Sequence, residues 1–162
     1  GRIPYSFNMY KVRCMLMKTT QLTHKEVMDI LPHREPMLLV DTVSYLESLR
    51  RIEAQYYIAP DLDIFKGHFP GKPVFPGVMS VESMAQAVDI MVMTTPKYAG
   101  KTPLFLGINN VRFTKKIQPG DTLTTRAELV SEREEKAVVT CKAIGYIGEE
   151  QAVSAEIVIA MR

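Results

Sequence analysis

A chain of 162 residues with 46% hydrophobic and 23% charged side chains has the composition of one globular domain. Its net charge of +2 argues against nucleic acid as the main partner, while it allows a local basic patch for an acidic one. No apolar run reaches the ~18 residues that a membrane-spanning helix needs. Cys14 and Cys141 form no Cys-x-x-Cys pair and the histidines do not cluster, so we predict no disulfide framework and no metal site. This cysteine usage fits a reducing compartment, and we expect a cytoplasmic protein.

Residues 1–20 carry four basic residues and no acidic one. Such a composition resembles a transit peptide, but a cloning remnant (a tag) or an over-extended start explains it equally well. We therefore treat residues 1–20 as an N-terminal extension, which we expect to pack against a neighbouring subunit. Residues 21–162 are predicted to form a single domain.

The first predicted elements of this domain are a short helix and two strands. A capping box, Thr23-His24-Lys25-Glu26, starts an amphipathic helix that Pro32 ends. Residues 37–40 are an apolar run suited to a buried strand. Residues 51–58 alternate between an apolar and a polar face, which predicts a half-buried strand.

Residues 78–95 are dense in Val, Met, Ile and Ala and contain no Gly or Pro, which predicts one helix of about 27 Å. This helix is apolar on nearly every side, so we expect it to be buried. Further strands are predicted at 104–108, 123–129, 137–147 and 152–161, with a turn at 118–121. A long helix against five or six mostly antiparallel strands is an α+β layout in which the sheet curls around the helix. The open edges of such a sheet favour pairing between subunits.

The loop GHFPGKPVFPG, residues 67–77, holds three prolines and three glycines around one histidine. Proline limits backbone freedom and glycine permits conformations closed to other residues, so the loop is suited to aiming a side chain. Its only titratable ring is His68, which near neutral pH can accept or give a proton. The alternative, that His68 is an ordinary hydrogen-bonded loop residue, stays open.

Glu82 is the only charged residue between Lys72 and Asp89, and it lies on the helix that we expect to be buried. Ionising a carboxyl in an apolar setting is costly, so burial favours the protonated form, which can donate a proton. Opposite His68 across a cavity, Glu82 would complete an acid and base couple. The alternative is that Glu82 pairs with Gln86 or with the backbone and only fills a polar gap.

Gly77 marks the start of the helix, where unpaired N–H groups and the positive end of the helix dipole lie. Its amide could polarise a carbonyl oxygen as an oxyanion hole does, although a glycine near an N-cap is also ordinary. Loss of water from a 3-hydroxyacyl thioester requires a base, a proton donor and a polarised carbonyl. His68, Glu82 and Gly77 could supply them in that order, and this chemistry needs no cofactor.

Three segments resemble the FabZ-type 3-hydroxyacyl-[acyl-carrier-protein] dehydratases of bacterial fatty-acid synthesis: LPHREPMLLVD (31–41), GHFPGKPVFPGVMSVESMAQA (67–87) and LFLGINNVRFTKKIQPGDTL (104–123). The resemblance runs from about Thr23 to the C-terminus. It implies a hotdog fold, in which a curled antiparallel sheet wraps a central helix, and a homodimer that is commonly assembled into a hexamer, a trimer of dimers. It also implies a hydro-lyase that converts a (3R)-3-hydroxyacyl chain on an acyl carrier protein to the trans-2-enoyl form.

The same resemblance implies roles for single residues. His68 matches the catalytic His and Glu82 the catalytic Glu, which meet from opposite subunits at a shared tunnel. Gly77 matches the residue whose amide faces the thioester carbonyl, and Val74 one whose backbone carbonyl steadies the His. The related dehydratase-isomerases carry Asp at the acid position, so Glu82 favours the FabZ type.

The chain departs from the family pattern at three positions. Glu35 replaces an aromatic residue, Leu104 a Tyr thought to gate the tunnel, and Thr114 an Arg. Nearby, the basic side chains that could dock an acidic carrier protein are Arg112, Lys115 and Lys116. These three could equally form a solvated basic strand edge.

Two other functions stay open at this point. A thioesterase of the same fold would use a carboxylate near the helix, such as Glu82, to activate water, but the histidine motif fits dehydration better. A non-catalytic acyl-binding module has no need of a His/Glu couple, and the sequence shows no appended helix-turn-helix.

Overall fold

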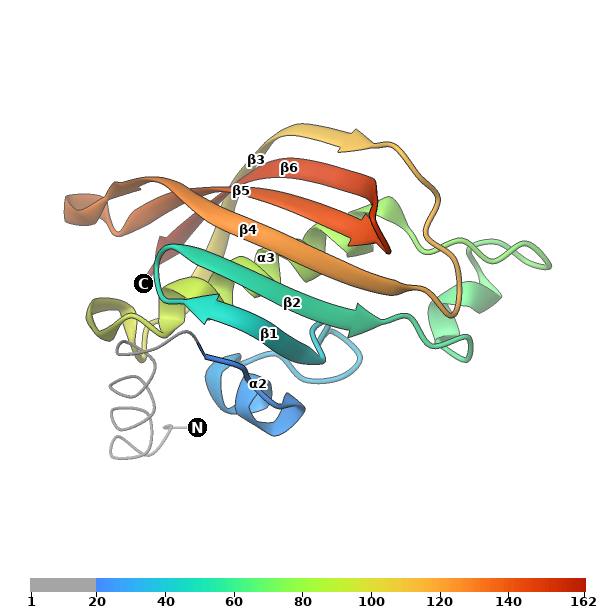
Figure 1. Ribbon diagram of the computed structural model, residues 1–162, viewed down its shortest axis with the longest axis horizontal. Coiled ribbons are helices and arrows are strands. Elements are labelled where there is room, and N and C mark those ends of the chain that lie inside the picture. Colours follow the sequence, from blue (N-terminus) through green and yellow to red (C-terminus); the bar gives the residue numbers. More distant parts are fainter. Residues whose placement is uncertain (1–19) are drawn as a thin grey trace.

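The computed structural model describes residues 20–162, so the expected subunit contact of the N-terminal extension and Cys14 lie outside the described residues. One sheet curves around a central helix, which confirms the predicted α+β layout (Figure 1). The strands are β1 (Thr42–Glu47), β2 (Arg51–Tyr57), β3 (Pro103–Phe113), β4 (Thr122–Arg133), β5 (Val138–Ile147) and β6 (Glu150–Met161). The helices are α2 (His24–Ile30) and α3 (Gly77–Met93), with short 3-10 turns at Asp63–Lys66, Pro96–Tyr98 and Glu134–Lys136. The strand order is β1-β2-β4-β5-β6-β3, and every neighbouring pair is antiparallel.

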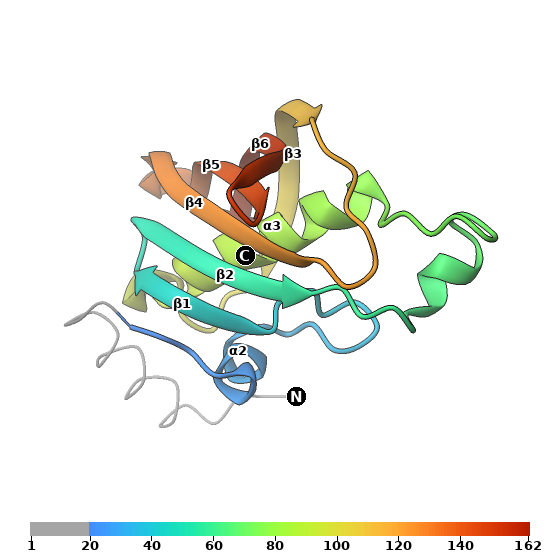
Figure 2. The same cartoon turned by 45° about the vertical axis from the view of Figure 1, so that its right-hand side comes forward.

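The central helix α3 is the buried element that the sequence predicts. Every residue from 83 to 93 is buried, and the sheet wraps over the helix in both views (Figures 1 and 2). The helix ends at Met93, two residues before the predicted range does. It stops there because Pro96 disfavours helical geometry in the residue before it, and Thr95 is extended.

The alternating patterns of β2 and β6 are confirmed by burial. Ile52, Ala54 and Tyr56 of β2 face the core. The residues of β6 that were expected on one face, Val153, Ala155, Ile157, Ile159 and Met161, are all buried. The capping box of α2 is also present, since the Thr23 side chain and the Glu26 side chain each bond the other's backbone.

The strand predicted at residues 37–40 is wrong, because this segment joins no sheet, although Leu38, Leu39 and Val40 are buried. Side chains of α3 bind its backbone instead. The Leu39 N–H donates to Gln86 Oε1 at 2.7 Å, the Leu39 carbonyl accepts from Ser83 Oγ at 2.7 Å, and Gln86 Nε2 donates to the Met37 carbonyl at 2.6 Å. The backbone groups of a buried segment need partners, and here a helix supplies them where a strand neighbour would otherwise be needed.

The two edges of the sheet differ in how they are covered. Beside β1 runs the chain at residues 20–22, where the Thr20 N–H donates to the Leu46 carbonyl at 3.1 Å and Leu22 pairs with Val43. Within residues 20–162, nothing pairs with the outer edge of β3. Several large apolar side chains of β3 are exposed: Leu104, Phe105, Leu106, Ile108 and Phe113. A long apolar edge of this kind is a template for pairing with another chain.

The connection between β2 and α3, residues 58–76, projects beyond the sheet in both views (Figures 1 and 2). We call this segment the arm. It contains His68, so the histidine belongs to a part of the chain that reaches outward from its own core. Among the described residues, no helix combines the length and apolar character needed to cross a membrane.

Candidate active site

The ring of His68 is held by two contacts within the arm. Its Nδ1 lies 2.8 Å from the Val74 carbonyl oxygen, and its face stacks on Phe69 with centroids 3.9 Å apart and planes at 30°. A carbonyl oxygen can only accept, so Nδ1 carries the proton in the neutral ring. Nε2 is then left with the lone pair that a base requires.

A tight turn within the arm sets this geometry. The Phe69 N–H donates to the Lys72 carbonyl at 3.1 Å, and the Lys72 N–H donates back to the Phe69 carbonyl at 2.9 Å. Gly71 lies in this turn at a φ of +74°, a conformation that side-chain-bearing residues rarely adopt. The chain then returns so that the Val74 N–H donates to the His68 carbonyl at 3.0 Å, which brings the Val74 carbonyl to the imidazole.

Glu82 extends from the first half of α3, and its side chain is 24% exposed. Gln86 Nε2 donates to Glu82 Oε1 at 3.0 Å, so the pairing with Gln86 that the sequence left open is present. Among residues 20–162, Glu82 and His68 form no hydrogen bond or ion pair with each other; His68 lies in the arm and Glu82 on α3.

A second imidazole, which sequence analysis did not single out, lies beside Glu82. His33 Nε2 is 3.8 Å from Glu82 Oε1. Burial lowers the pKa of His33, with Arg34 acting in the same direction and Glu82 opposing them. A neutral His33 makes this a polar contact and not a strong ion pair. The only sequence signal for it was its place in the Pro-His-Arg segment of the first motif.

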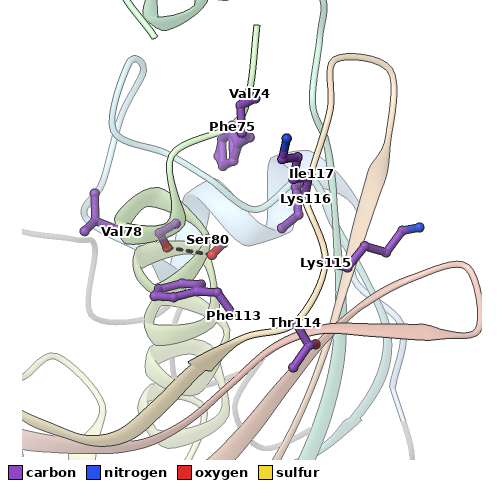
Figure 3. Close-up of a pocket in the computed structure, with 10 residues that line it drawn as sticks. Val74, Phe75, Val78, Ser80, Phe113, Thr114, Lys115, Lys116 and Ile117 are labelled. Carbon is purple, nitrogen blue, oxygen red and sulfur yellow. Dashed lines mark hydrogen bonds between the residues drawn. The ribbon is translucent and has the colours of Figure 1, made fainter. Parts of the chain in front are cut away.

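An open pocket of about 540 Å³ lies beside the N-terminal end of α3 (Figure 3). Its lining residues are Val74, Phe75, Gly77, Val78, Ser80, Phe113, Thr114, Lys115, Lys116 and Ile117. The pocket thus brings together four of the predicted site residues: Val74, Gly77, Lys115 and Lys116. His68, Glu82 and Arg112 are not among the residues that line it.

Gly77 is the first residue of α3 and contributes its backbone to this pocket. Its carbonyl accepts from Ser80 Oγ at 2.6 Å, the bond drawn in Figure 3. The first N–H groups of a helix have no acceptor within the helix. Within residues 20–162, no group accepts a hydrogen bond from the Gly77 N–H, so this donor is available to a bound group.

Asp89, two turns beyond Glu82 on α3, is a further carboxyl that sequence analysis did not weigh. Its side chain is 5% exposed, and in the part of the chain that the structure describes its Oδ1 has no hydrogen-bond partner. Burial, and to a lesser degree the nearby Glu82, raise the pKa of Asp89 well above its usual value. Burial thus favours the protonated form of the Asp89 carboxyl.

A family model described as a FabA-like domain matches residues 31–156, most of the chain. The chain belongs to the FabA-like family. Among curated relatives of this FabA-like chain is a 3-hydroxyacyl-[acyl-carrier-protein] dehydratase FabZ of Symbiobacterium thermophilum, 42% identical over 83% of this chain and 93% of the relative. The protein of the same name from Oenococcus oeni is 40% identical over 87% of this chain and 100% of the relative.

Solved structures resemble this FabA-like chain in fold. The dehydratase heterocomplex ApeI:P from Xenorhabdus doucetiae matches with a TM-score of 0.71 and 20% identity, over 84% of this chain and 90% of that one. A hypothetical thioesterase with coenzyme A from Streptococcus pneumoniae matches with a TM-score of 0.56 and 10% identity, over 74% and 84%. The predicted hotdog fold is confirmed. At these sequence identities the two structural similarities support the fold and not the reaction.

Proposed function

We propose that this FabA-like protein is a 3-hydroxyacyl-[acyl-carrier-protein] dehydratase of fatty-acid synthesis, a hydro-lyase acting in the cytoplasm. It converts the (3R)-3-hydroxyacyl chain of an acyl carrier protein to the trans-2-enoyl chain. The observation that carries the proposal is the match to FabZ dehydratases along nearly their whole length, 93% and 100% for the two relatives above. The orientation of His68, whose Nδ1 faces the Val74 carbonyl, supports it independently.

In the proposed reaction, Nε2 of His68 removes a proton from C2 of the acyl chain. The C2–H electron pair forms the C2=C3 double bond while the C3–O bond breaks. Glu82 gives its proton to the departing hydroxyl, which leaves as water. The Gly77 N–H, at the positive end of the α3 dipole, donates to the thioester oxygen as negative charge develops there.

We propose that this site is assembled between two copies of the chain. The arm carries His68 outward, Glu82 stays on the core helix, and the outer edge of β3 is unpaired among the described residues. Pairing β3 with the β3 of a second copy covers the exposed apolar edge. His68 of one copy then meets Glu82 of the other. The hexamer built from three such dimers follows from the resemblance to FabZ.

The acidic carrier protein docks, in this proposal, at the rim of the pocket in Figure 3. Lys115 and Lys116 line the pocket, and Arg112 is exposed near the end of β3. Lys115 already pairs with Glu150 at 3.3 Å, whereas Lys116 has no ion-pair partner in residues 20–162. Lys116 is thus more available to an incoming anion than Lys115, and Arg112 likewise has no ion-pair partner in the described residues.

Hydration of a crotonyl thioester, followed by the loss of enoyl absorbance, tests the reaction in reverse. We expect wild-type protein to remove the absorbance without releasing free thiol. His68→Ala and Glu82→Gln should each lower the rate by about 10²–10⁴-fold, the usual share of a general acid or base. Circular dichroism should show an unchanged fold.

Near-normal turnover in either variant would refute its assigned role. Release of thiol with no change in enoyl absorbance would identify a thioesterase, and tight acyl binding with no turnover would identify a binding module.

A further inference from the structure

Phe69 is an apolar side chain outside the core with an unusual neighbour. It is 53% exposed, yet one face of its ring lies on the imidazole of His68, with centroids 3.9 Å apart and planes at 30°. At this separation the faces of the two rings are in van der Waals contact. The exposed Phe69 ring therefore makes a specific contact with His68, although the ring adds little to the buried core.

The stacking supplies a constraint on His68 that its hydrogen bond cannot. The Nδ1 contact with the Val74 carbonyl fixes one atom of the ring, and the ring plane can still swing about that bond. A flat surface against the ring removes this swing. The two contacts together define the direction in which Nε2 points.

The surface that Phe69 provides is itself held in place. Its backbone N–H and carbonyl both bond Lys72, in the tight turn that Gly71 allows. The ring is thus carried by a turn with few alternative conformations and not by a flexible loop. Such anchoring is what a rigid support for a reacting group needs.

We propose that Phe69 is a positioning residue for His68: its ring sets the plane of the imidazole and supports the ring when it becomes a cation. The inference rests on the proposed function, in which His68 takes a proton from C2. An aromatic face attracts a nearby cation, and His68 is charged only after that transfer. The contact therefore strengthens as the reaction proceeds, so its loss lowers kcat more than it changes KM.

The experiment compares Phe69→Leu and Phe69→Tyr with wild type in hydration of a crotonyl thioester. Phe69→Leu keeps an apolar side chain and removes the flat face, and we expect kcat to fall by about 10- to 100-fold with KM nearly unchanged. Phe69→Tyr restores the face and should restore kcat to within a few-fold. Tyr57→Leu is the matched control, because Tyr57 is exposed to a similar extent (50%) and makes no ring contact in residues 20–162.

A second measurement does not depend on activity. In NMR spectra of protein with labelled histidine, we expect ring-current shifts of the His68 ring protons in wild type and Phe69→Tyr, and their loss in Phe69→Leu. Wild-type protein with these shifts but without dehydratase activity would defeat the proposed function and leave the stacking role in place. The stacking role is overturned if the wild-type shifts are absent. It is equally overturned if an active wild type and Phe69→Leu have equal kcat, or if Tyr57→Leu loses as much.

Discussion

A methyl group added to Gly77 would lie 2.7 Å from Cε1 of Phe113, closer than side-chain carbons approach such atoms in folded proteins. The first residue of α3 and the last residue of β3 are therefore in close contact, and a side chain at position 77 requires the Phe113 ring to move. Both residues line the pocket at whose rim we place the carrier protein (Figure 3), and the Gly77 N–H is the proposed donor to the thioester oxygen. Gly77 thus affects the shape of the pocket and also supplies a backbone N–H donor to it.

Gly77→Ala should lower kcat/KM by about 10-fold, because the Phe113 ring must move where the thioester binds. Phe113 is 56% exposed, so its ring can turn outward, and the free energy of unfolding should change by less than about 1 kcal/mol. Enoyl hydration and urea unfolding measure the two effects. Gly77→Ala combined with Phe113→Leu should recover part of the activity. A loss of stability with no recovery in the double variant would contradict the local explanation.

Reversal of the charges on Lys115 and Lys116, as Lys115→Glu with Lys116→Glu, should raise KM for a carrier-linked substrate by about 10-fold. A small thioester analogue should be hydrated as before, because it brings no acidic protein. Lys116→Ala alone should act more strongly than Lys115→Ala, since Lys115 is already paired with Glu150. Lys142→Glu, an exposed lysine on β5, is the control. Equal effects on both substrates would defeat the docking proposal.

Lysines placed on the open edge of β3 should separate the proposed dimer. Leu106→Lys with Ile108→Lys puts two charges where an apolar edge would be buried, and like charges meeting across paired copies are unfavourable. Sedimentation should show the mass of one chain, and hydration should fall with it because His68 and Glu82 no longer meet. Val130→Lys, an equally exposed apolar site on β4, should change neither. Full activity at the mass of one chain would contradict the shared site.

At neutral pH, Asp89→Asn should have a larger free energy of unfolding than wild type, because an amide does not ionise and so removes the proton release that favours the unfolded wild-type chain. Burial raises the pKa of Asp89 in the folded chain well above the value of 3.8 for an unperturbed aspartate. Above pH 3.8 the unfolded chain releases a proton that the folded chain keeps. Stability therefore falls as pH rises from that value toward the folded pKa. Asp89→Asn removes this dependence.

Urea unfolding of both proteins at a series of pH values measures the difference. Cys141, the buried thiol near Asp89, does not interfere, because burial and Asp89 raise its pKa to about 12. Parallel stability curves for the two proteins would show that Asp89 does not titrate in this range.

Local sequence patterns were sufficient to predict the elements in which apolar residues recur at regular positions along the chain. A long segment rich in apolar residues and bounded by Pro76 and Pro96 predicted α3, and alternating apolar residues predicted β2 and β6. The segment at residues 37–40 shows where such patterns fail. Its apolar side chains predict a strand, but the polar side chains of Ser83 and Gln86 bind its backbone. These partners lie 44 and 47 residues away in the sequence, so no local pattern reveals them.

For the candidate site, the sequence by itself determined which residue types are available: His68 in a stiff loop, the Glu82 carboxyl on a buried helix and Gly77 at the start of that helix. The tertiary structure alone decided what they touch. The approach of His33 to Glu82 and the fit of Phe113 against Gly77 depend on how segments far apart in the sequence pack together. The physical reason is range, because periodicity reports on residues a few positions apart, whereas a site joins side chains whose distance is set by how whole elements pack.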